Sequence, residues 1–197
     1  MNDKYDAFIG SFIDNKIGIS TSFLSAELSK NLRTNLEQLD RENRMLPAGI
    51  GNDLIKDQHQ QKRRDKICWI DKKNNNIHEL EFLEEVERFI DYLNRTCYTG
   101  INAYEFHYAL YDTGSYYRRH KDQFKTNQDR KYSLINYLND DWQETDGGAL
   151  IVYQDNKTET ILPDMQKAVF FQSSELEHEV AIAHRPRMSI TGWLKRL

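Results

Sequence analysis

The chain has 197 residues, of which 39% are hydrophobic and 12% aromatic, and its formal net charge is −4. This composition excludes a disordered protein, and the length suffices for one domain with a buried core over residues 1–197. The negative charge disfavours nucleic acid and membrane surfaces as partners, because both attract basic proteins. Cys68 and Cys97 are too few for a disulfide framework, which predicts a reducing, cytoplasmic location. Neither a signal-peptide pattern nor an apolar stretch of the ~18 residues that a membrane span needs is found.

Two segments of the N-terminal half show the spacing of amphipathic helices, and we expect both to pack on a sheet. Residues 20–43 begin with hydroxyl side chains that suit a helix start. They then carry a stripe of Leu24, Leu28, Leu32, Leu36 and Leu39. Residues 77–95 carry a similar stripe of Leu80, Leu83, Val86, Ile90 and Leu93.

The segment between the two helices is predicted to be a loop that leads into a short strand. Residues 56–66 are polar and charged, whereas residues 67–70 are mostly apolar. The loop is longer than a plain connection needs, which leaves room for a function.

From Tyr104 onward the hydrophobic period changes to two, which is typical of strands. Many short strands separated by turn residues favour a sandwich or barrel, with the helices packed outside it. The predicted strands cover residues 104–112, 131–140, 148–155, 167–173, 178–183 and 187–195.

His120 and Asp122 are candidate metal ligands, because residues i and i+2 of a strand share a face. A His-x-Asp match alone is weak, since about half a match is expected by chance in a chain of this composition. His178 opens a predicted strand just after a loop and is the candidate third ligand. Two histidines and one carboxylate would leave three open positions on an octahedral ion, as in non-haem Fe(II) oxygenases. Taken alone, His178 also fits a solvated histidine at a strand end.

The last predicted strand separates into an apolar face and a polar face. Met188, Ile190 and Leu194 share one side. Arg187, Ser189, Thr191 and Trp193 share the other side. If the polar row lines a barrel, the buried Arg187 needs an anionic partner, and a dicarboxylate would supply two charge-assisted hydrogen bonds. The alternative is a surface strand with an exposed arginine.

Six motifs in order resemble the iron- and 2-oxoglutarate-dependent dioxygenases, and most closely their prolyl hydroxylase branch. The similarity is to oxygen-sensing prolyl hydroxylases and their bacterial homologues, and it covers at least residues 63–197. Residues 1–62 match more loosely. The motifs read RRDKICWID, YALYDTGSYYRRHKD, YLNDDW, DGGAL, HEV and RMSITGW.

The resemblance implies roles for particular residues. His120, Asp122 and His178 would bind Fe(II). Arg187 and Tyr137 would bind the distal carboxylate of 2-oxoglutarate, and Tyr111 would face the same pocket. Thr191 would support the cosubstrate or an iron-bound water, and Ser189 is a further cosubstrate residue whose role is open. The positions that contact a substrate peptide would be Arg63, Asp65, Arg130 and Trp193.

The implied fold is mainly β, with a double-stranded β-helix (jelly-roll) core and N-terminal α-helices. Residues 1–100 would form the helical support and substrate loop, and residues 101–197 the catalytic core. The implied reaction consumes O2 and 2-oxoglutarate, yields succinate and CO2, and hydroxylates a proline of a protein substrate, with a translation factor as the first candidate. Ascorbate is a candidate reductant. We also expect residues 56–66 to be a lid that orders on the protein substrate. The oligomeric state is not predicted.

Three other functions would use the same fold. A nucleic-acid demethylase would carry a second arginine six residues after the first, where this chain has Trp193. A small-molecule or free amino-acid hydroxylase would share the iron site but would not need the 56–66 loop. A non-catalytic jelly-roll binding protein would need neither a complete metal triad nor Arg187.

Overall fold

The computed structural model describes residues 3–49, 62–123, 128–154 and 157–197. Residues 56–61 of the predicted lid therefore lie outside the described residues. None of the described helices is long and apolar enough to cross a membrane. The elements in chain order are α1 (Asp3–Asn15), β1 (Ile17–Ser20), α2 (Ala26–Arg41), β2 (Leu46–Pro47), β3 (Lys66–Trp69), η1 (Lys72–Asn74), α4 (Ile77–Thr96), β4 (Ala103–Tyr111), β5 (Tyr117–His120), β6 (Arg130–Tyr137), η2 (Glu144–Asp146), β7 (Leu150–Gln154), β8 (Lys157–Ile161), β9 (Ala168–Gln172), β10 (Glu177–Val180) and β11 (Arg187–Lys195).

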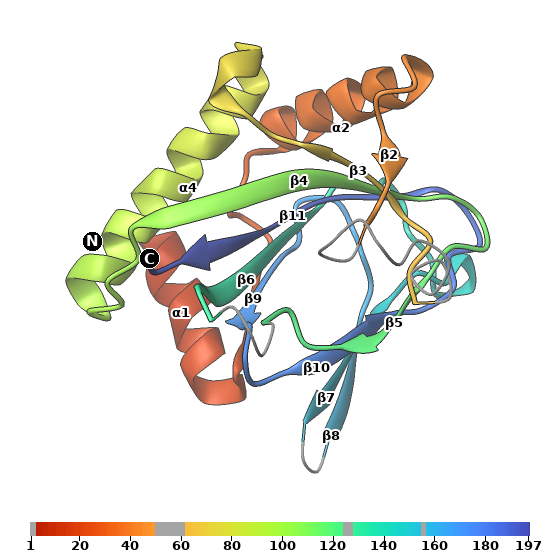
Figure 1. The fold of residues 1–197 in the computed structure, drawn as a ribbon. Helices are drawn as coiled ribbons and strands as arrows, with labels where there is room; N and C mark the ends of the chain where they lie inside the picture. Colours follow the sequence, from red (N-terminus) through yellow and green to blue (C-terminus); the bar gives the residue numbers. More distant parts are fainter. Residues whose placement is uncertain (1–2, 50–61, 124–127, 155–156) are drawn as a thin grey trace.

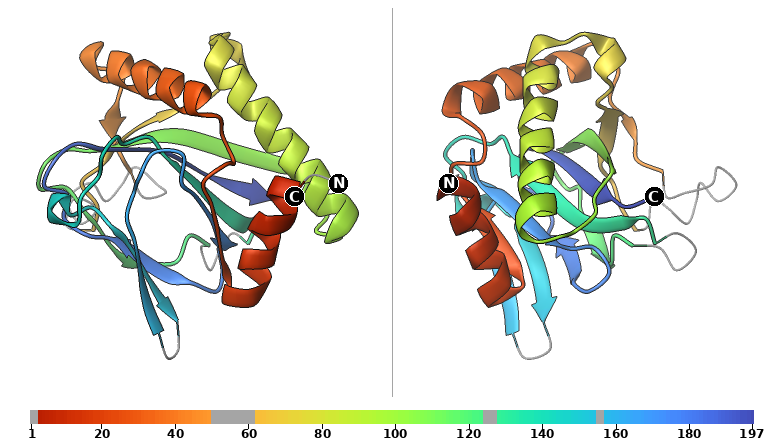
Figure 2. Two further views of the ribbon diagram at one scale, coloured as in Figure 1. Left: turned by 180° about the vertical axis from the view of Figure 1, so that it is seen from behind. Right: turned by 90° about the vertical axis from the view of Figure 1, so that its left-hand side faces the viewer.

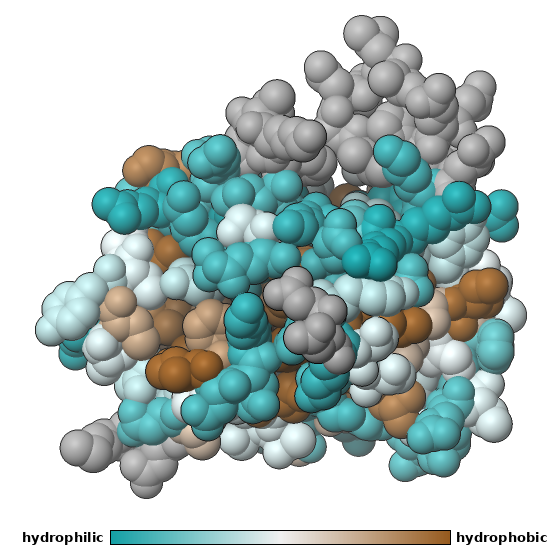
Figure 3. Space-filling view, turned by 90° about the horizontal axis from the view of Figure 1, so that it is seen from below, coloured by the Kyte–Doolittle hydropathy of each residue, from teal (hydrophilic) through white to brown (hydrophobic). Residues whose placement is uncertain are grey.

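Two antiparallel sheets form the core and confirm the predicted jelly-roll class. The larger sheet has the order β1-β9-β6-β11-β4-β3-β2, and the smaller sheet has the order β5-β10-β7-β8. The helices lie on the outer side of the larger sheet, away from the smaller one (Figures 1 and 2). Seen from below, on the side of the smaller sheet, the surface mixes hydrophilic side chains with hydrophobic patches (Figure 3).

The larger sheet is buried on both faces, and successive residues of its strands alternate between two cores. On the helix side, Met188, Ile190 and Leu194 of β11 join the main core, as predicted. On the other side, Ile135 and Val169 pack with residues of the smaller sheet. The polar row of β11 therefore faces the space between the sheets, which is the interior of the jelly roll.

The first amphipathic stripe is confirmed with one change. Leu28, Leu32, Leu36 and Leu39 are buried along α2. Leu24 is also buried but precedes the helix, because the Ser25 side chain caps its first turn by accepting a hydrogen bond from the Leu28 amide at 3.1 Å.

The second stripe is wider than predicted. Leu83, Val86, Ile90 and Leu93 of α4 are buried, together with Phe82 and Phe89, whereas Leu80 is only partly buried. Phe89 stacks on Phe8 of α1, with ring centroids 5.6 Å apart. Helix α1 was not predicted from the sequence. Its aromatic side chains pack in the same core as those of α4, so α4 buries a wider face than predicted.

The predicted strands are all present, with ends that move by a few residues. The strand expected at residues 67–70 is β3, and the run at 178–183 ends early, at Val180 of β10. Four strands were not among the predicted runs, namely β1, β2, β5 and β8. Two of them, β5 and β8, have polar sequences, so hydrophobic alternation does not reveal them.

The centre of the larger sheet leaves no room for a side chain at Gly192. A Cβ there would lie 2.2 Å from Phe106 Cδ1 and 2.3 Å from the Glu105 carbonyl oxygen. We expect Gly192→Ala to lower the free energy of unfolding by about 1–3 kcal/mol, measured by urea titration. Gly10→Ala is the control, because a Cβ at Gly10 meets no atom within 4 Å and the position is helical. The control should gain about 0.5–1 kcal/mol, and equal stabilities of the two variants would contradict the packing argument.

Candidate active site

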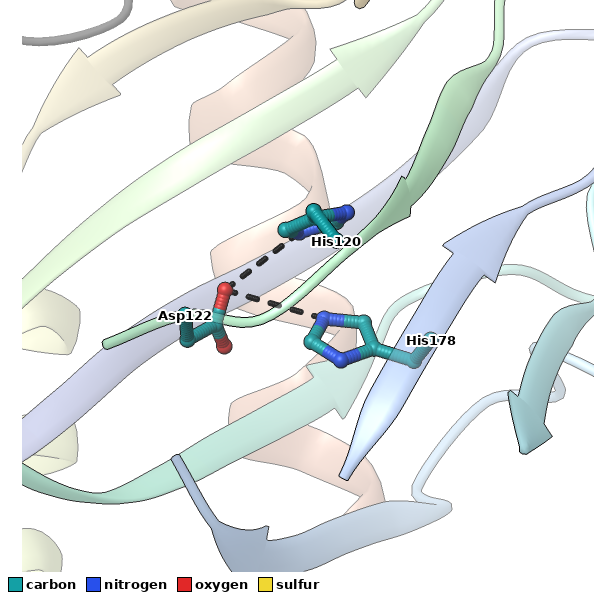
Figure 4. Close-up of side chains that lie close together, drawn as sticks. All are labelled: His120, Asp122 and His178. Carbon is teal, nitrogen blue, oxygen red and sulfur yellow. Dashed lines mark ion pairs between the residues drawn. The ribbon is translucent and has the colours of Figure 1, made fainter. Parts of the chain in front are cut away.

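Two paired strands and the loop after one of them bring three candidate metal ligands together. In the pairing of β10 with β5, His178 lies opposite His120. Asp122 Oδ1 is 3.4 Å from His120 Nε2 and 3.6 Å from His178 Nε2 (Figure 4). The expectation that His120 and Asp122 share one strand was wrong, because β5 ends at His120 and Asp122 follows in a loop. The loop still turns the carboxylate toward both imidazoles.

Backbone carbonyls hold both imidazoles in the orientation that a metal requires. Nδ1 of His120 lies 2.7 Å from the Arg118 carbonyl oxygen, and Nδ1 of His178 lies 3.3 Å from that of Leu176. When each Nδ1–H donates to its carbonyl, the Nε2 lone pair faces Asp122. Burial lowers the pKa of His178 to about 4, against the opposing effect of Asp122, so the ring is neutral, as a ligand must be.

The carboxylate of Asp122 is buried and ionised. Burial by itself raises its pKa, but His178, His120 and a hydrogen bond from Ser133 outweigh this effect and hold the pKa well below its usual range. Ser133 Oγ donates to Oδ2 at 2.7 Å and lies 2.9 Å from Ser173 Oγ. The ligand atoms of the three residues lie within 4.8 Å of one another, so two imidazoles and one carboxylate could hold a divalent ion from one side.

A cavity of about 240 Å³ beside the triad contains a buried guanidinium. Arg187 is 2% exposed and forms no ion pair with any carboxylate that the structure describes. Its guanidinium lies 4.8 Å from the Tyr111 ring centroid and 5.0 Å from that of Tyr137, and the buried Tyr137 hydroxyl also lacks a hydrogen-bond partner in the described chain. An uncompensated buried charge is costly, so this pair of donors fits the carboxylate of a ligand.

A pair of glycines in the DGGAL motif positions this arginine. Arg187 Nε donates to the Gly148 carbonyl oxygen at 2.8 Å. Gly147 and Gly148 have φ angles of 65° and 62°, and a Cβ at Gly147 would lie 2.2 Å from the Ile182 carbonyl oxygen. Only glycine combines this backbone with this close approach. The motif entered the sequence analysis as part of the resemblance alone, without a role.

The other predicted cosubstrate residues lie around Arg187. Tyr111 and Thr191 line the cavity. Ser189 is fully buried behind them, and its hydroxyl lies 3.5 Å from Arg187 Nη1 and 3.4 Å from Thr191 Oγ1. Ser189 therefore contacts the residues of the cavity wall rather than the cavity itself.

The four predicted substrate residues form two pairs, Arg63 with Asp65 and Arg130 with Trp193. Arg63 and Asp65 form a bidentate ion pair with distances of 2.7 and 2.5 Å, and the Asp65 carboxylate is completely buried. The Arg63 guanidinium lies 4.4 Å from the Tyr117 ring centroid. Arg130 lies 3.4 Å from the Trp193 ring centroid. Arg63, Arg130 and Trp193 line the cavity, and Asp65 holds Arg63 from behind.

Two aromatic side chains of this site were not predicted from the sequence. Tyr117 stacks on His120, with ring centroids 3.5 Å apart and planes at 15°. His107 is buried between Trp69 and Trp193, at centroid distances of 4.9 and 5.5 Å. Burial, with Arg63 and Arg130 nearby, lowers the pKa of His107 to about 3, so its imidazole is neutral. Counting by two from Tyr111 along the predicted strand would have placed His107 on the same face.

Comparisons with known proteins agree with this geometry. Residues 106–195 match the model of the 2OG-Fe(II) oxygenase superfamily. A crystal structure of a Pseudomonas putida prolyl-4-hydroxylase is 30% identical with a TM-score of 0.88, covering 98% of this chain and 99% of that one. A prolyl hydroxylase in complex with a hypoxia inducible factor oxygen degradation domain peptide fragment, from Trichoplax adhaerens, is 24% identical with a TM-score of 0.86 and coverages of 98% and 89%.

A more distant likeness shows the fold alone. The epimerase SnoN, solved with Fe3+, alpha ketoglutarate and nogalamycin RO, is 9% identical with a TM-score of 0.70 and coverages of 99% and 84%. The match to the Pseudomonas putida enzyme, by contrast, extends over nearly the full length of both chains. This chain therefore belongs to the 2OG-Fe(II) oxygenase superfamily, in its prolyl hydroxylase branch, and is a dioxygenase that uses Fe(II), 2-oxoglutarate and O2.

Proposed function

We propose that this dioxygenase hydroxylates a prolyl residue of a protein substrate. The observation that carries the proposal is the aromatic wall of the cavity beside the triad, formed by Tyr117, Trp69 and Trp193. Saturated rings such as pyrrolidine pack well on aromatic faces. The full-length similarity to a prolyl-4-hydroxylase supports the same substrate class.

In this proposal His120, Asp122 and His178 hold Fe(II), which supplies the oxidation chemistry when bound together with O2 and 2-oxoglutarate. Asp122 remains ionised and His178 remains neutral, so these two residues can bind the metal without first losing a proton. Tyr117 is a positioning residue, because its ring covers one face of the His120 imidazole.

The cosubstrate would lie between the triad and Arg187. Arg187 donates to the distal carboxylate together with the Tyr137 hydroxyl, while Tyr111 and Thr191 shape the space around it. Ser189 supports Arg187 from the side away from the cavity. Burial of the guanidinium strengthens its attraction for an anion and excludes water from the pair.

The peptide would lie against the opposite wall. Arg63, Arg130 and Trp193 contact it, and Asp65 keeps Arg63 in place.

We further propose that residues 1–197 act as one unit and that the substrate is a translation factor. We also propose that the enzyme works in the cytoplasm and that ascorbate serves as a reductant. The two free cysteines fit a reducing compartment.

Incubation with host lysate tests the substrate class directly. The purified protein with Fe(II), 2-oxoglutarate and ascorbate should add one oxygen atom to a proline in a small set of proteins, detected by peptide mass spectrometry. Lysate treated with the Asp122→Ala variant is the background. Conversion of free proline or another small molecule, with no protein gaining oxygen, would replace the proposal with a small-molecule hydroxylase.

Removal of the carboxylate ligand should abolish metal binding without unfolding the chain. Asp122→Ala leaves only the two imidazoles of the triad, and the loss of its one anionic ligand should weaken Mn(II) binding by at least ~100-fold, measured by electron paramagnetic resonance. The thermal midpoint should change little, because the substitution also removes a buried charge. Asp112→Ala, at an exposed site that pairs with Lys66 at 3.2 Å, is the matched control. Unchanged Mn(II) affinity in Asp122→Ala would show that the ion lies elsewhere.

Loss of the buried guanidinium should lower the affinity for 2-oxoglutarate more than the affinity for the metal. Arg187→Met should weaken 2-oxoglutarate binding by ~30-fold or more, because a charge-assisted pair in a closed pocket contributes on the order of 2–5 kcal/mol. Arg185→Met is the control, since Arg185 pairs with Asp146 at 2.9 Å and is partly exposed. Titration of each Mn(II)-loaded protein with 2-oxoglutarate measures the effect, and equal affinities would refute the anchor role.

A further inference from the structure

Two short extended segments at the mouth of the cavity run antiparallel to each other. Arg63 pairs with Tyr117, the Arg118 amide donates to the Lys62 carbonyl oxygen at 2.8 Å, and the Arg64 amide donates to the Tyr116 carbonyl oxygen at 3.0 Å. Successive side chains of extended segments point to opposite sides. Arg63 and Tyr117 line the cavity, so their neighbours in each segment face outward.

The outward positions of these segments carry Lys62, Arg64 and Arg118. Together with Lys121, which follows β5, they form a cluster of cations that we call the basic ledge. All four residues are exposed, and Lys121 also lines the cavity, so the ledge is continuous with its mouth. The guanidinium groups of Arg64 and Arg118 lie 5.3 and 5.7 Å from the Tyr116 ring centroid, which keeps these side chains close together.

The basic ledge has no carboxylate partner in the part of the chain that the structure describes. None of its four side chains forms an ion pair with a carboxylate among the described residues, whereas the adjacent Arg119 binds Glu177. The chain as a whole has a net charge of −4, so this concentration of positive charge opposes the overall balance. Like charges held close together without counter-ions cost free energy, which an anionic partner would recover.

We propose that the basic ledge binds an acidic segment of the protein substrate, next to the residue that enters the cavity. The inference rests on the proposed function. An extended peptide advances about 3.3 Å per residue, so residues only a few positions from the target would reach the ledge. Each exposed contact is weak, but several together steer association and select a partner of the opposite charge. The ledge thus narrows the substrate class to proteins with aspartate or glutamate close to the target proline.

Matched peptides test this selectivity. One peptide carries a central proline flanked on both sides by glutamate, and its twin carries glutamine at the same positions. Binding to the Mn(II)- and 2-oxoglutarate-loaded protein is followed by fluorescence anisotropy at low and high salt. The acidic peptide should bind about 10-fold more tightly at low salt, and the difference should shrink at high salt as the charges are screened.

A triple variant identifies the ledge as the cause. Lys62→Gln/Arg64→Gln/Arg118→Gln should bind the acidic peptide about 10-fold more weakly and the glutamine peptide within twofold of the unchanged protein. Its affinity for 2-oxoglutarate reports that the fold is kept. The control variant, Lys16→Gln/Lys30→Gln/Lys73→Gln, has the same change in net charge at exposed sites that do not line the cavity.

Three outcomes would overturn the proposal. The first is equal binding of the two peptides, and the second is an equal loss in the triple variant and the control variant. The third is tighter binding of a single-stranded RNA than of the acidic peptide, which would make the ledge a nucleic-acid surface. In each case proline hydroxylation in the lysate experiment would still support the proposed function, so failure of the ledge and failure of the function are distinguishable.

Discussion

The register between β10 and β5 is the constraint on which the site depends. It places His178 opposite His120, and a slip of one residue would turn one imidazole to the other face of the sheet. Several contacts fix this register. On its other edge, β10 pairs with β7. In β5, the Tyr117 ring stacks on His120 and also contacts the Arg63 guanidinium, which forms an ion pair with Asp65. The position of a metal ligand thus depends on a buried ion pair before β3.

Two buried charges of opposite sign lie in the same cavity and remain separate. Asp122 is 7% exposed and Arg187 is 2% exposed, and they form no ion pair with each other. In the proposed function, direct pairing would stabilise the protein without ligands but would occupy both groups that bind ligands. The separation leaves an anion available for the metal and a cation for the proposed contact with the cosubstrate. Binding of either ligand should therefore recover part of the desolvation cost, which couples ligand binding to stability.

Much of this arrangement could be predicted from the sequence, and the remainder depends on tertiary contacts. Strict alternation predicted the two faces of β11. The cost of burying a charge predicted that Arg187, once buried, needs an anionic partner. The end of β5 at His120 could not be predicted, because its polar sequence has no hydrophobic period. The same limit concealed Tyr117, whose role appears only when its ring is seen on His120. The orientation of Asp122 depends on Ser133 of β6, and local sequence does not specify that contact.

In this fold, the alternation of side chains along extended segments lets the two faces of one segment carry different roles. In β11, Met188 and Ile190 stabilise the helix-side core, while Arg187 and Thr191 line the cavity. Next to Arg63, the outward side chains are those of the basic ledge, so in our proposal Arg63 contacts the part of the peptide that enters the cavity while its neighbours contact the adjacent acidic segment. In this proposal, substitutions of Lys62, Arg64 or Arg118 would change the preferred protein substrate while His120, Asp122 and His178 keep their positions.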